Sequence, residues 1–367
     1  MERPTLEDQE DRLRRLGAVR QDLEAEDYGL LVTAPENRRY LSGFRGSAGA
    51  LLVTRKAAVI VVDGRYFDQA RDQAVGYEVV LQAGSLLGTI ADKANSLGVR
   101  VLLFEAQDVT FSAYRELSRL GSEHGLFIEA RDDPVALLRR IKSKAEIERI
   151  RRACEIASDA LEHASKVIRP GVTERFVAWE VERLMREAGA EAIKTNHVIA
   201  SGPRGALPHG QATDRVLERG DLITLDIGAR VDGYYSDITR TFALGPTNAR
   251  AREVYGLVLE AQTIALSAIR AKVVAETVDE VVRTFFQAHG VRERFTHSLG
   301  HGIGLEVHEF PRLAPGDRTV LQPGMVTSVE PGLYVPGWGG VRIEDLVFVE
   351  EGGVENLCAF PKTLMEL

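Results

Sequence analysis

The segment GDLITLDIGARVDGYYSDITRTFALG, residues 220–245, carries the pattern of a β-hairpin. An Asp-Gly pair stands at its middle between two apolar runs, and this is a strong hairpin signal. A hairpin centred on the pair places Gly228 opposite Asp237, and Asp226 then lies diagonally from Asp237 on the same face. Diagonal neighbours are about 7–8 Å apart at the backbone. The sequence therefore predicts two converging carboxylates, with room left for them by Gly228, which has no side chain.

Asp226 is the more informative carboxylate because it stands inside an apolar run, between Leu225 and Ile227. Aspartate is depleted in strands, and burial of a lone carboxylate is costly unless the group is paired or bound to a metal. Two surface carboxylates near a turn would be the alternative interpretation. It fits Asp232 at the tip of the hairpin but fits Asp226 poorly.

A second hairpin is predicted where MVTSVEPGLYV (325–335) runs into GGVRIEDLVFVEEGGVENL (339–357). If it is centred on Gly337, Glu330 lies opposite Glu344. Both glutamates stand in apolar surroundings, so the argument made for Asp226 applies to them as well.

The segment LGHGIGLEVHEFPR, residues 299–312, places His301 between glycines. Glycine loses more backbone entropy on folding than other residues, so such a run predicts that the backbone passes close to another group. A His-Glu pair follows at 308–309, but the zinc-protease helix that it resembles needs a second histidine where this chain has Arg312. If His301 is a metal ligand, its partners must come from elsewhere in the chain.

One histidine and the four carboxylates of the two hairpins match a centre of two divalent ions that activate a shared water. A carboxylate-rich ligand set favours Mn²⁺, with Co²⁺ or Zn²⁺ as alternatives. Any one of these residues could instead be a hydrogen-bonded core residue, but five together favour a metal site. The candidate ligands are Asp226, Asp237, His301, Glu330 and Glu344.

Length, charge and cysteine content narrow the class of protein. The chain has 367 residues, which predicts two domains, and its net charge of −8 argues against a nucleic-acid partner. The charged N-terminal segment lacks the apolar core of a signal peptide, and no apolar run approaches the ~18 residues that span a membrane. Cys154 and Cys358 are the only cysteines, which argues against a disulfide framework and a thiolate zinc site. We expect a cytoplasmic protein with no membrane partner.

Residues 1–133 alternate helical and strand-like segments, typical of an α/β domain, and carry no cluster of catalytic residue types. The expected strands are 29–34, two within 49–64, 77–83 and 99–106, and the expected helices are 13–27 and 86–98. A boundary is predicted at Pro134, which disfavours helix in the residue before it. The second domain, 134–367, should begin with one long helix over 135–168, ended by Pro170.

Five motifs carry a resemblance to a known family: PHG at 208–210, LDIGARVDGYYSDITRTF at 225–242, LGHGIGLEVHE at 299–309, SVEPGLY at 328–334 and GVRIED at 340–345. In type and order they resemble the motifs of the pita-bread metallopeptidases, which include aminopeptidase P, prolidase and methionine aminopeptidase. The resemblance covers about residues 135–360. The segment NRRYLSGFRGSAGALLV, 37–53, looks like the creatinase-type N-terminal domain, which methionine aminopeptidases lack. The resemblance therefore implies a Xaa-Pro peptidase of mixed α/β (α+β) class, with a creatinase-like N-terminal domain and a C-terminal pita-bread domain.

The resemblance also implies a role for each metal ligand. Asp237 and Glu344 would bridge two ions, Asp226 would complete the first, and His301 with Glu330 would complete the second. Glu330 would also carry a proton to the leaving nitrogen.

Four further residues receive roles from the resemblance. His308 would bind the substrate and the developing oxyanion, and His209 would hold the substrate near the metals. His297 would line the pocket for proline, and Arg342 would hold a ligand carboxylate. A buried histidine bonded to backbone is the alternative for His209 and His297, and a buried salt bridge is the alternative for Arg342.

Two activities stay open at this point. Xaa-Pro dipeptidase (prolidase) cleaves dipeptides, whereas aminopeptidase P removes the residue before proline from longer peptides. Arg312 resembles the arginine with which some prolidases pair the C-terminal carboxylate of a dipeptide, although similar arginines occur in short aminopeptidases and a surface arginine is the alternative. We favour the dipeptidase, acting as a homodimer on short proline-containing peptides. A metal-free binding module is the alternative of another class, but such modules typically lack ligands, and all five are present here.

Overall fold

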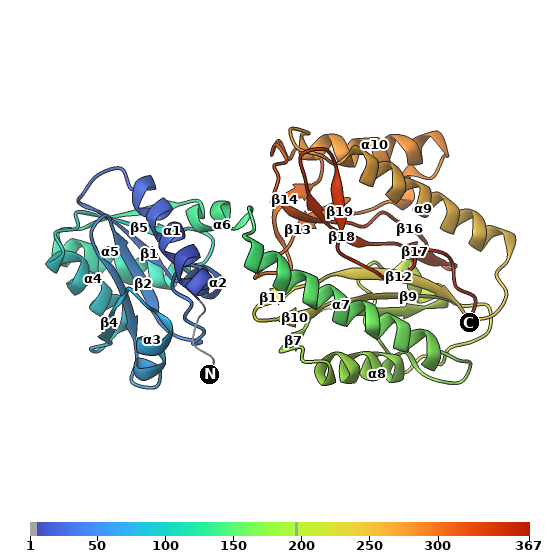
Figure 1. Ribbon diagram of the computed structural model, residues 1–367, viewed down its shortest axis with the longest axis horizontal. Coiled ribbons are helices and arrows are strands. Elements are labelled where there is room, and N and C mark those ends of the chain that lie inside the picture. Colours follow the sequence, from blue (N-terminus) through green and yellow to red (C-terminus); the bar gives the residue numbers. More distant parts are fainter. Residues whose placement is uncertain (1–5, 195–196) are drawn as a thin grey trace. The chain divides into compact units, whose positions relative to one another are not determined.

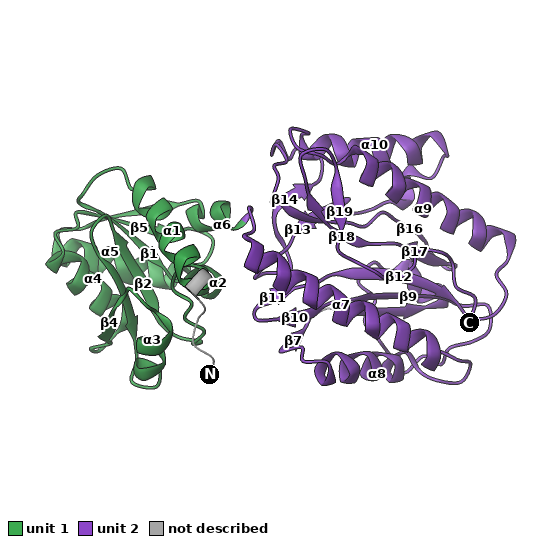
Figure 2. Cartoon of the chain, viewed as in Figure 1, with its two compact units in different colours: residues 1–139 green, residues 140–367 purple. Residues whose placement is uncertain are grey.

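The computed structural model describes residues 6–194 and 197–367. The chain divides into two compact units, Met1–Arg139 and Arg140–Leu367 (Figure 2). The division falls after the short helix α6 (Pro134–Arg139), which packs against α1 (Leu6–Asp22) and α2 (Pro35–Ser42) of the first unit. Within the described residues, every helix is too short or too polar to traverse a lipid bilayer.

The first unit is built around a six-stranded sheet with the strand order β4-β3-β2-β1-β5-β6. Its strands are β1 (Tyr28–Val32), β2 (Ala50–Thr54), β3 (Ala58–Val62), β4 (Glu78–Leu81), β5 (Val101–Glu105) and β6 (Phe127–Arg131), and its other helices are α3 (Phe67–Gln73), α4 (Leu86–Ser96) and α5 (Phe111–His124). The strands predicted in this part of the sequence and the helix predicted over 86–98 are confirmed, whereas the helix predicted over 13–27 begins earlier and ends at Asp22. Apolar residues of α4 and α5 pack against one face of the sheet and form its core. This unit is therefore a conventional α/β domain.

The second unit places strands between two pairs of helices, as Figure 1 shows. The helices are α7 (Lys144–Val167), α8 (Glu174–Glu187), α9 (Ala249–Ala268) and α10 (Ala275–Ala288). The strands are β7 (Ala192–Ile193), β8 (Val198–Ser201), β9 (Leu222–Ile227), β10 (Ala229–Val231), β11 (Tyr234–Tyr235), β12 (Ile238–Ala243), β13 (Gly300–Gly302), β14 (Glu309–Leu313), β15 (Val326–Val329), β16 (Gly332–Val335), β17 (Gly339–Arg342), β18 (Asp345–Val349) and β19 (Val354–Asn356). Helix α7 packs on β10, β11 and β12, and α8 packs on β7 and β8. Helix α9 packs on β15, β16 and β17, and α10 packs on β14.

The prediction of one continuous helix over 135–168 is wrong. Helix α6 ends at Arg139, and α7 begins anew at Lys144. The reason is a capping box: the Ser143 side chain accepts from the Glu146 backbone N–H, and the Glu146 side chain accepts from the Ser143 backbone N–H. These reciprocal bonds satisfy donors that are otherwise unpaired at a helix start, so a new helix begins here.

The first predicted hairpin is confirmed with its register. Asp226 lies opposite Thr239 in the pairing of β9 with β12, and Arg230 lies opposite Tyr235 in the pairing of β10 with β11. Since the same register holds on both sides of Asp237, no bulge intervenes. Asp226 and Asp237 therefore lie on one face of the hairpin, as predicted.

The second predicted hairpin is confirmed as well. Val329 lies opposite Asp345 in β15 and β18, and Gly332 lies opposite Arg342 in β16 and β17. Glu330 and Glu344 stand between these two paired stretches, in the same register.

A buried arginine joins the two hairpins. The Arg240 guanidinium donates to Asp345 Oδ1 at 2.7 Å and to the Glu344 carbonyl at 2.6 Å. Thr239 and Glu344 also form a β-bridge. Because charged groups inside a core need partners, this network fixes the segment between β17 and β18, which contains Glu344, against β12.

Candidate metal centre

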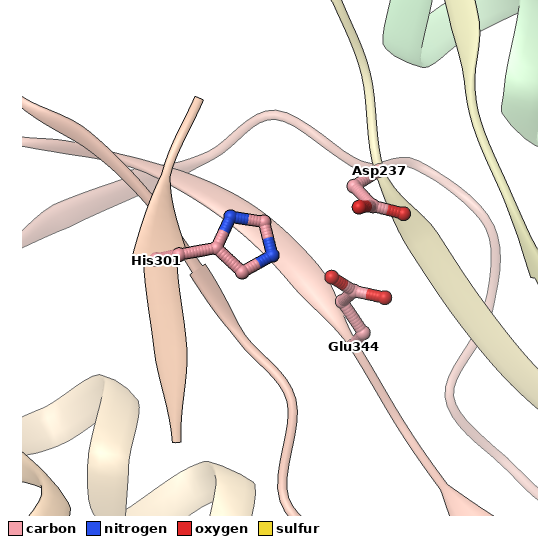
Figure 3. Close-up of side chains that lie close together, drawn as sticks. All are labelled: Asp237, His301 and Glu344. Carbon is pink, nitrogen blue, oxygen red and sulfur yellow. The ribbon is translucent and has the colours of Figure 1, made fainter. Parts of the chain in front are cut away.

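Three of the predicted ligands converge in the second unit. The ligand atoms of Asp237, His301 and Glu344 all lie within 4.8 Å of one another. Figure 3 shows the His301 imidazole pointing toward the two carboxylates, each residue coming from a different segment of the chain. Their residue exposures are only 1% for Asp237, 7% for His301 and 1% for Glu344. One histidine and two carboxylates at this spacing can hold a divalent ion.

The hydrogen bonds around these residues leave one oxygen without a partner. Glu344 Oε2 accepts from the Thr239 hydroxyl at 2.6 Å. Asp237 Oδ2 is buried and has no hydrogen-bond partner within residues 6–194 and 197–367. Buried polar atoms are nearly always paired, so the isolated oxygen fits a place for a cation.

His301 is oriented for metal binding by its own neighbours. Its Nδ1–H donates to the Gly302 carbonyl at 3.0 Å, so Nε2 faces Glu330 Oε1 at 3.3 Å. Burial lowers the pKa of the His301 imidazole, but the hydrogen bond and charge of Glu330 outweigh burial, and the pKa is raised overall. The raised pKa reflects a proton on Nε2 that faces Glu330, and a metal ion at Nε2 would take the place of that proton. Glu330, a fourth predicted ligand, therefore lies against His301 but outside the group of three ligand atoms that lie within 4.8 Å of one another.

The glycines beside His301 make room for neighbouring strands. A Cβ at Gly300 would lie 2.0 Å from the Ser328 carbonyl oxygen, and a Cβ at Gly302 would lie 2.3 Å from the Phe310 carbonyl oxygen. The predicted close approach of the backbone is confirmed. The family resemblance would explain these glycines by crowding of the backbone against the metal site, and this expectation is wrong, because the groups approached are the chain segments on either side of β13. A side chain larger than hydrogen would separate the strands that position His301.

The prediction that Gly228 leaves room for the carboxylates is wrong. A Cβ at Gly228 would lie 2.0 Å from the Ser236 carbonyl oxygen, so the space is taken by the opposite strand of the hairpin. The glycine therefore keeps the two strands close, and this closeness brings Asp226 and Asp237 together.

Asp226 has a different environment from the other ligands because cations hold both of its oxygens. Arg342 donates from Nη2 to Asp226 Oδ2 at 2.7 Å, and the Lys194 ammonium donates to Asp226 Oδ1. Lys194 also donates to Asp237 Oδ1 at 2.6 Å. Arg342 holds a predicted ligand carboxylate, and its contact is at the same time a buried salt bridge. Lys194 was not among the predicted residues.

The charges set the protonation of the cluster. Burial raises the pKa of the Asp237 carboxyl to about 7, although Lys194 opposes this. Burial and the neighbouring carboxylates raise the pKa of Glu344 well above its ordinary value. Burial also opposes ionisation of Asp226, but its two cationic partners outweigh burial and hold its pKa well below the usual range. Without a metal ion, Asp237 and Glu344 therefore tend to hold protons, and a divalent cation could replace those protons.

A cavity of about 410 Å³ opens above the cluster. Its lining includes every predicted substrate-binding residue: His209, His297, His308 and Arg312. His209, His308 and Arg312 have exposed side chains, and the His308 ring lies 4.3 Å from the His301 ring. The structure therefore brings all the predicted site residues to one cavity and its floor.

His297 is fixed by a relay that reaches the metal ligands. Its Nδ1–H donates to the Ser298 carbonyl at 2.7 Å, and its Nε2 accepts from the Tyr334 hydroxyl at 2.8 Å. The same hydroxyl accepts from Arg342 at 2.8 Å. Burial lowers the pKa of His297, which favours the neutral form of its ring at the cavity wall. His297 is thus both bonded to backbone and part of the cavity lining.

The fold and the site define a metal-dependent hydrolase, and comparisons with known proteins give its family. The chain matches Metallopeptidase family M24 over residues 148–351 and the Creatinase/Prolidase N-terminal domain over residues 15–141. It belongs to metallopeptidase family M24, and the fold class expected from the sequence is confirmed.

Two solved structures and one sequence relative illustrate the similarity. A Xaa-Pro dipeptidase of Pyrococcus furiosus is 38% identical over 340 residues, which is 92% of this chain and 94% of that protein. The structure of a Xaa-Pro dipeptidase from Bacillus anthracis has a TM-score of 0.92 and 42% identity, covering 98% of this chain and 99% of that chain. An X-Pro aminopeptidase from Thermotoga maritima has a TM-score of 0.89 and 35% identity, covering 96% and 99%. Relatives with either name therefore share the whole architecture.

Proposed function

We propose that this metallopeptidase hydrolyses the Xaa-Pro bond at the N-terminus of short peptides and that dipeptides are its preferred substrates. The observation that carries the proposal is the convergence of Asp237, His301 and Glu344, with one unpartnered carboxylate oxygen, at the floor of a histidine-lined cavity. The relatives named Xaa-Pro dipeptidase support the choice of substrate.

We propose Mn²⁺ as the ion at this position, held by the three converging residues and by Glu330. A bound divalent ion makes water a nucleophile at neutral pH and polarises the carbonyl that is attacked. The second ion that the family resemblance implies would have to lie between Asp226 and Asp237, where the Lys194 ammonium lies.

The side chains around this position supply proton transfer and substrate orientation. Glu330 lies beside His301 and within 3.2 Å of the Ser328 hydroxyl, so its carboxylate is fixed where it can take a proton from water and pass it to the leaving nitrogen. His308 reaches into the cavity beside His301 and would donate to the developing oxyanion. His209 would hold the peptide, and the neutral ring of His297 would pack against proline.

The proposed function is tested by hydrolysis of Ala-Pro beside Ala-Pro-Ala by the Mn²⁺-loaded full chain. We expect cleavage of both Xaa-Pro bonds, with the higher kcat/KM for the dipeptide. Faster cleavage of the tripeptide would move the assignment to Xaa-Pro aminopeptidase, the activity named for the Thermotoga maritima relative. Cleavage of neither by a chain that holds metal would contradict the proposal.

Replacing Arg312 with alanine is expected to weaken dipeptide binding. The side chain is exposed on β14, opposite His301, and lines the cavity, so it can meet the carboxylate of a bound dipeptide. A charged hydrogen bond contributes about 1.5–3 kcal/mol, so KM for Ala-Pro should rise roughly 10-fold or more. KM for Ala-Pro-Ala should change little. Arg318→Ala is the matched control, since that side chain is 84% exposed and does not line the cavity. An equal rise for both peptides would contradict this role.

We also propose that the enzyme acts as a cytoplasmic homodimer. Cys154 and Cys358 are free and buried, which suits a reducing compartment. The negative net charge supports the absence of a nucleic-acid partner.

A further inference from the structure

Lys194 places a positive charge inside the carboxylate cluster. Its ammonium nitrogen lies 2.6 Å from Asp237 Oδ1 and is also hydrogen-bonded to Asp226 Oδ1. The Lys194 side chain is only 10% exposed, and its two partners are more deeply buried still. Lys194 therefore forms buried ion pairs with two carboxylates, whereas most lysines are solvated at the protein surface.

The backbone holds Lys194 beside the hairpin that carries both aspartates. Its N–H donates to the Gly228 carbonyl at 2.8 Å, directly after the pairing of β7 with β10. Its Cβ would lie 3.4 Å from a Cβ at Gly228, so the start of the side chain is packed against the hairpin. The pairing of the strands therefore positions the Lys194 ammonium within the carboxylate cluster.

The charge of the cluster shows what this ammonium does. When all four are ionised, as metal ligation requires, Asp226, Asp237, Glu330 and Glu344 bring four negative charges, and Lys194 with Arg342 returns two positive charges. With a neutral His301, the remainder equals the charge of one divalent ion. A second divalent ion would turn the balance positive and would stand next to a buried ammonium, where repulsion between cations is strong.

The hydrogen bonds of Asp226 also argue against a second divalent ion. One of its oxygens is bound by Lys194 and the other by Arg342. The contact with Arg342 is compatible with a ligand carboxylate, but a metal ion shared by Asp226 and Asp237 would have to displace the Lys194 ammonium, which is hydrogen-bonded to Oδ1 of both. The position on Asp237, His301 and Glu344, by contrast, still offers an unpartnered oxygen among the described residues.

We propose that Lys194 is a built-in cation that fills one of two cation positions, so that the chain retains one divalent ion per active site. A second ion binds only where this ammonium is removed. The inference rests on the proposed metal-dependent function, because it assumes that the remaining position holds an ion. It assigns to this chain's own lysine the place that a second ion would take.

The test is the metal content of the full chain. Wild-type protein and Lys194→Met are loaded with excess Mn²⁺, freed of loose metal by gel filtration, and analysed by elemental mass spectrometry against protein concentration. We expect one Mn²⁺ per wild-type chain and a twofold higher content in Lys194→Met. Electron paramagnetic resonance should give the spectrum of an isolated Mn²⁺ in the wild type and of two spin-coupled ions in the variant.

Two control variants separate the charge of Lys194 from the loss of a buried lysine. Lys194→Arg keeps a cation and should retain one ion. Lys142→Met removes another buried lysine, which pairs with Glu309 at 3.0 Å and does not line the cavity, and it too should retain one ion.

Each outcome bears on a stated claim. Two ions in the wild type, or one ion in a folded Lys194→Met, would overturn the role of Lys194. If that variant does not fold, the number of Mn²⁺ ions per wild-type chain and the wild-type paramagnetic resonance spectrum still test the proposal. No retained ion in the wild type would contradict metal dependence itself and this inference with it. An inactive wild type that retains one ion would contradict only the proposed peptidase function.

Discussion

Asp237→Asn is expected to lose its metal ion and to lower kcat/KM for Ala-Pro by about 10³-fold or more, because the activated water depends on the ion. Asp237 supplies the one buried carboxylate oxygen that lacks a partner among the described residues. The amide keeps the size of the side chain but not its charge, so the ligand is weakened without a cavity. Ion content and steady-state kinetics on the same preparation measure the two losses together.

The same substitution should leave the metal-free protein at least as stable as the wild type. Burial raises the pKa of Asp237 from 3.8 to about 7, so this group lowers stability as the pH rises between these two values, and the loss is complete above about 7. At pH 8 the asparagine removes this cost. Thermal unfolding in a chelating buffer should show an unchanged or higher midpoint.

Asp232→Asn is the matched control for Asp237→Asn. Asp232 stands at the tip of the same hairpin, has a φ of 44° that asparagine tolerates, and pairs with Arg149 at 2.7 Å away from the cavity. Its ion content and activity should equal those of the wild type. Retention of the ion by Asp237→Asn would show that the centre lies elsewhere.

Glu330→Gln is expected to lower kcat by about 10²–10⁴-fold, the usual contribution of a positioned acid–base group, with little change in KM. Burial opposes ionisation of Glu330, but the hydrogen bond and charge of His301 outweigh burial and lower the pKa of Glu330 to about 2. The group is therefore ionised at neutral pH and ready to accept a proton, whereas glutamine cannot. The ion should be retained on the three other ligands.

Measurement of kcat, KM and ion content together separates proton transfer from ligation. A loss of the ion equal to the loss of activity would make Glu330 a ligand only, and wild-type kcat would refute both roles. Glu350→Gln is the matched control, because Glu350 is an exposed residue just after β18 of the same hairpin.

The parts of the site that could be predicted from the sequence are those set by local strand pairing. An Asp-Gly tip and a glycine-rich loop each fix the register of the residues on either side, so Asp226, Asp237 and the two glutamates could be paired by counting. His301 was found from its flanking glycines, whose reason is the close approach of neighbouring strands. Most of the candidate metal ligands could therefore be predicted from local strand pairing alone.

Lys194 could not be found in this way. It lies after β7, a strand of two residues that pairs with β10 far along the chain, and nothing in EAIKTNH marks it as buried. The relay from His297 through Tyr334 to Arg342 is equally tertiary. The break between α6 and α7, by contrast, had a local signal in Ser143 and Glu146 that the apolar periodicity obscured.

The register of the two hairpins has a consequence for how related chains can differ in length. The spacing of the carboxylates is set by paired strands, and the loops at the tips take no part in it. Insertions should therefore accumulate at the tips, around residues 232–233 and 336–338. A single residue gained or lost inside a strand between Asp226 and Asp237 would turn one carboxylate to the opposite face. Length variation at the tips is thus compatible with an intact centre, whereas a one-residue change within the strands identifies a relative that has lost it.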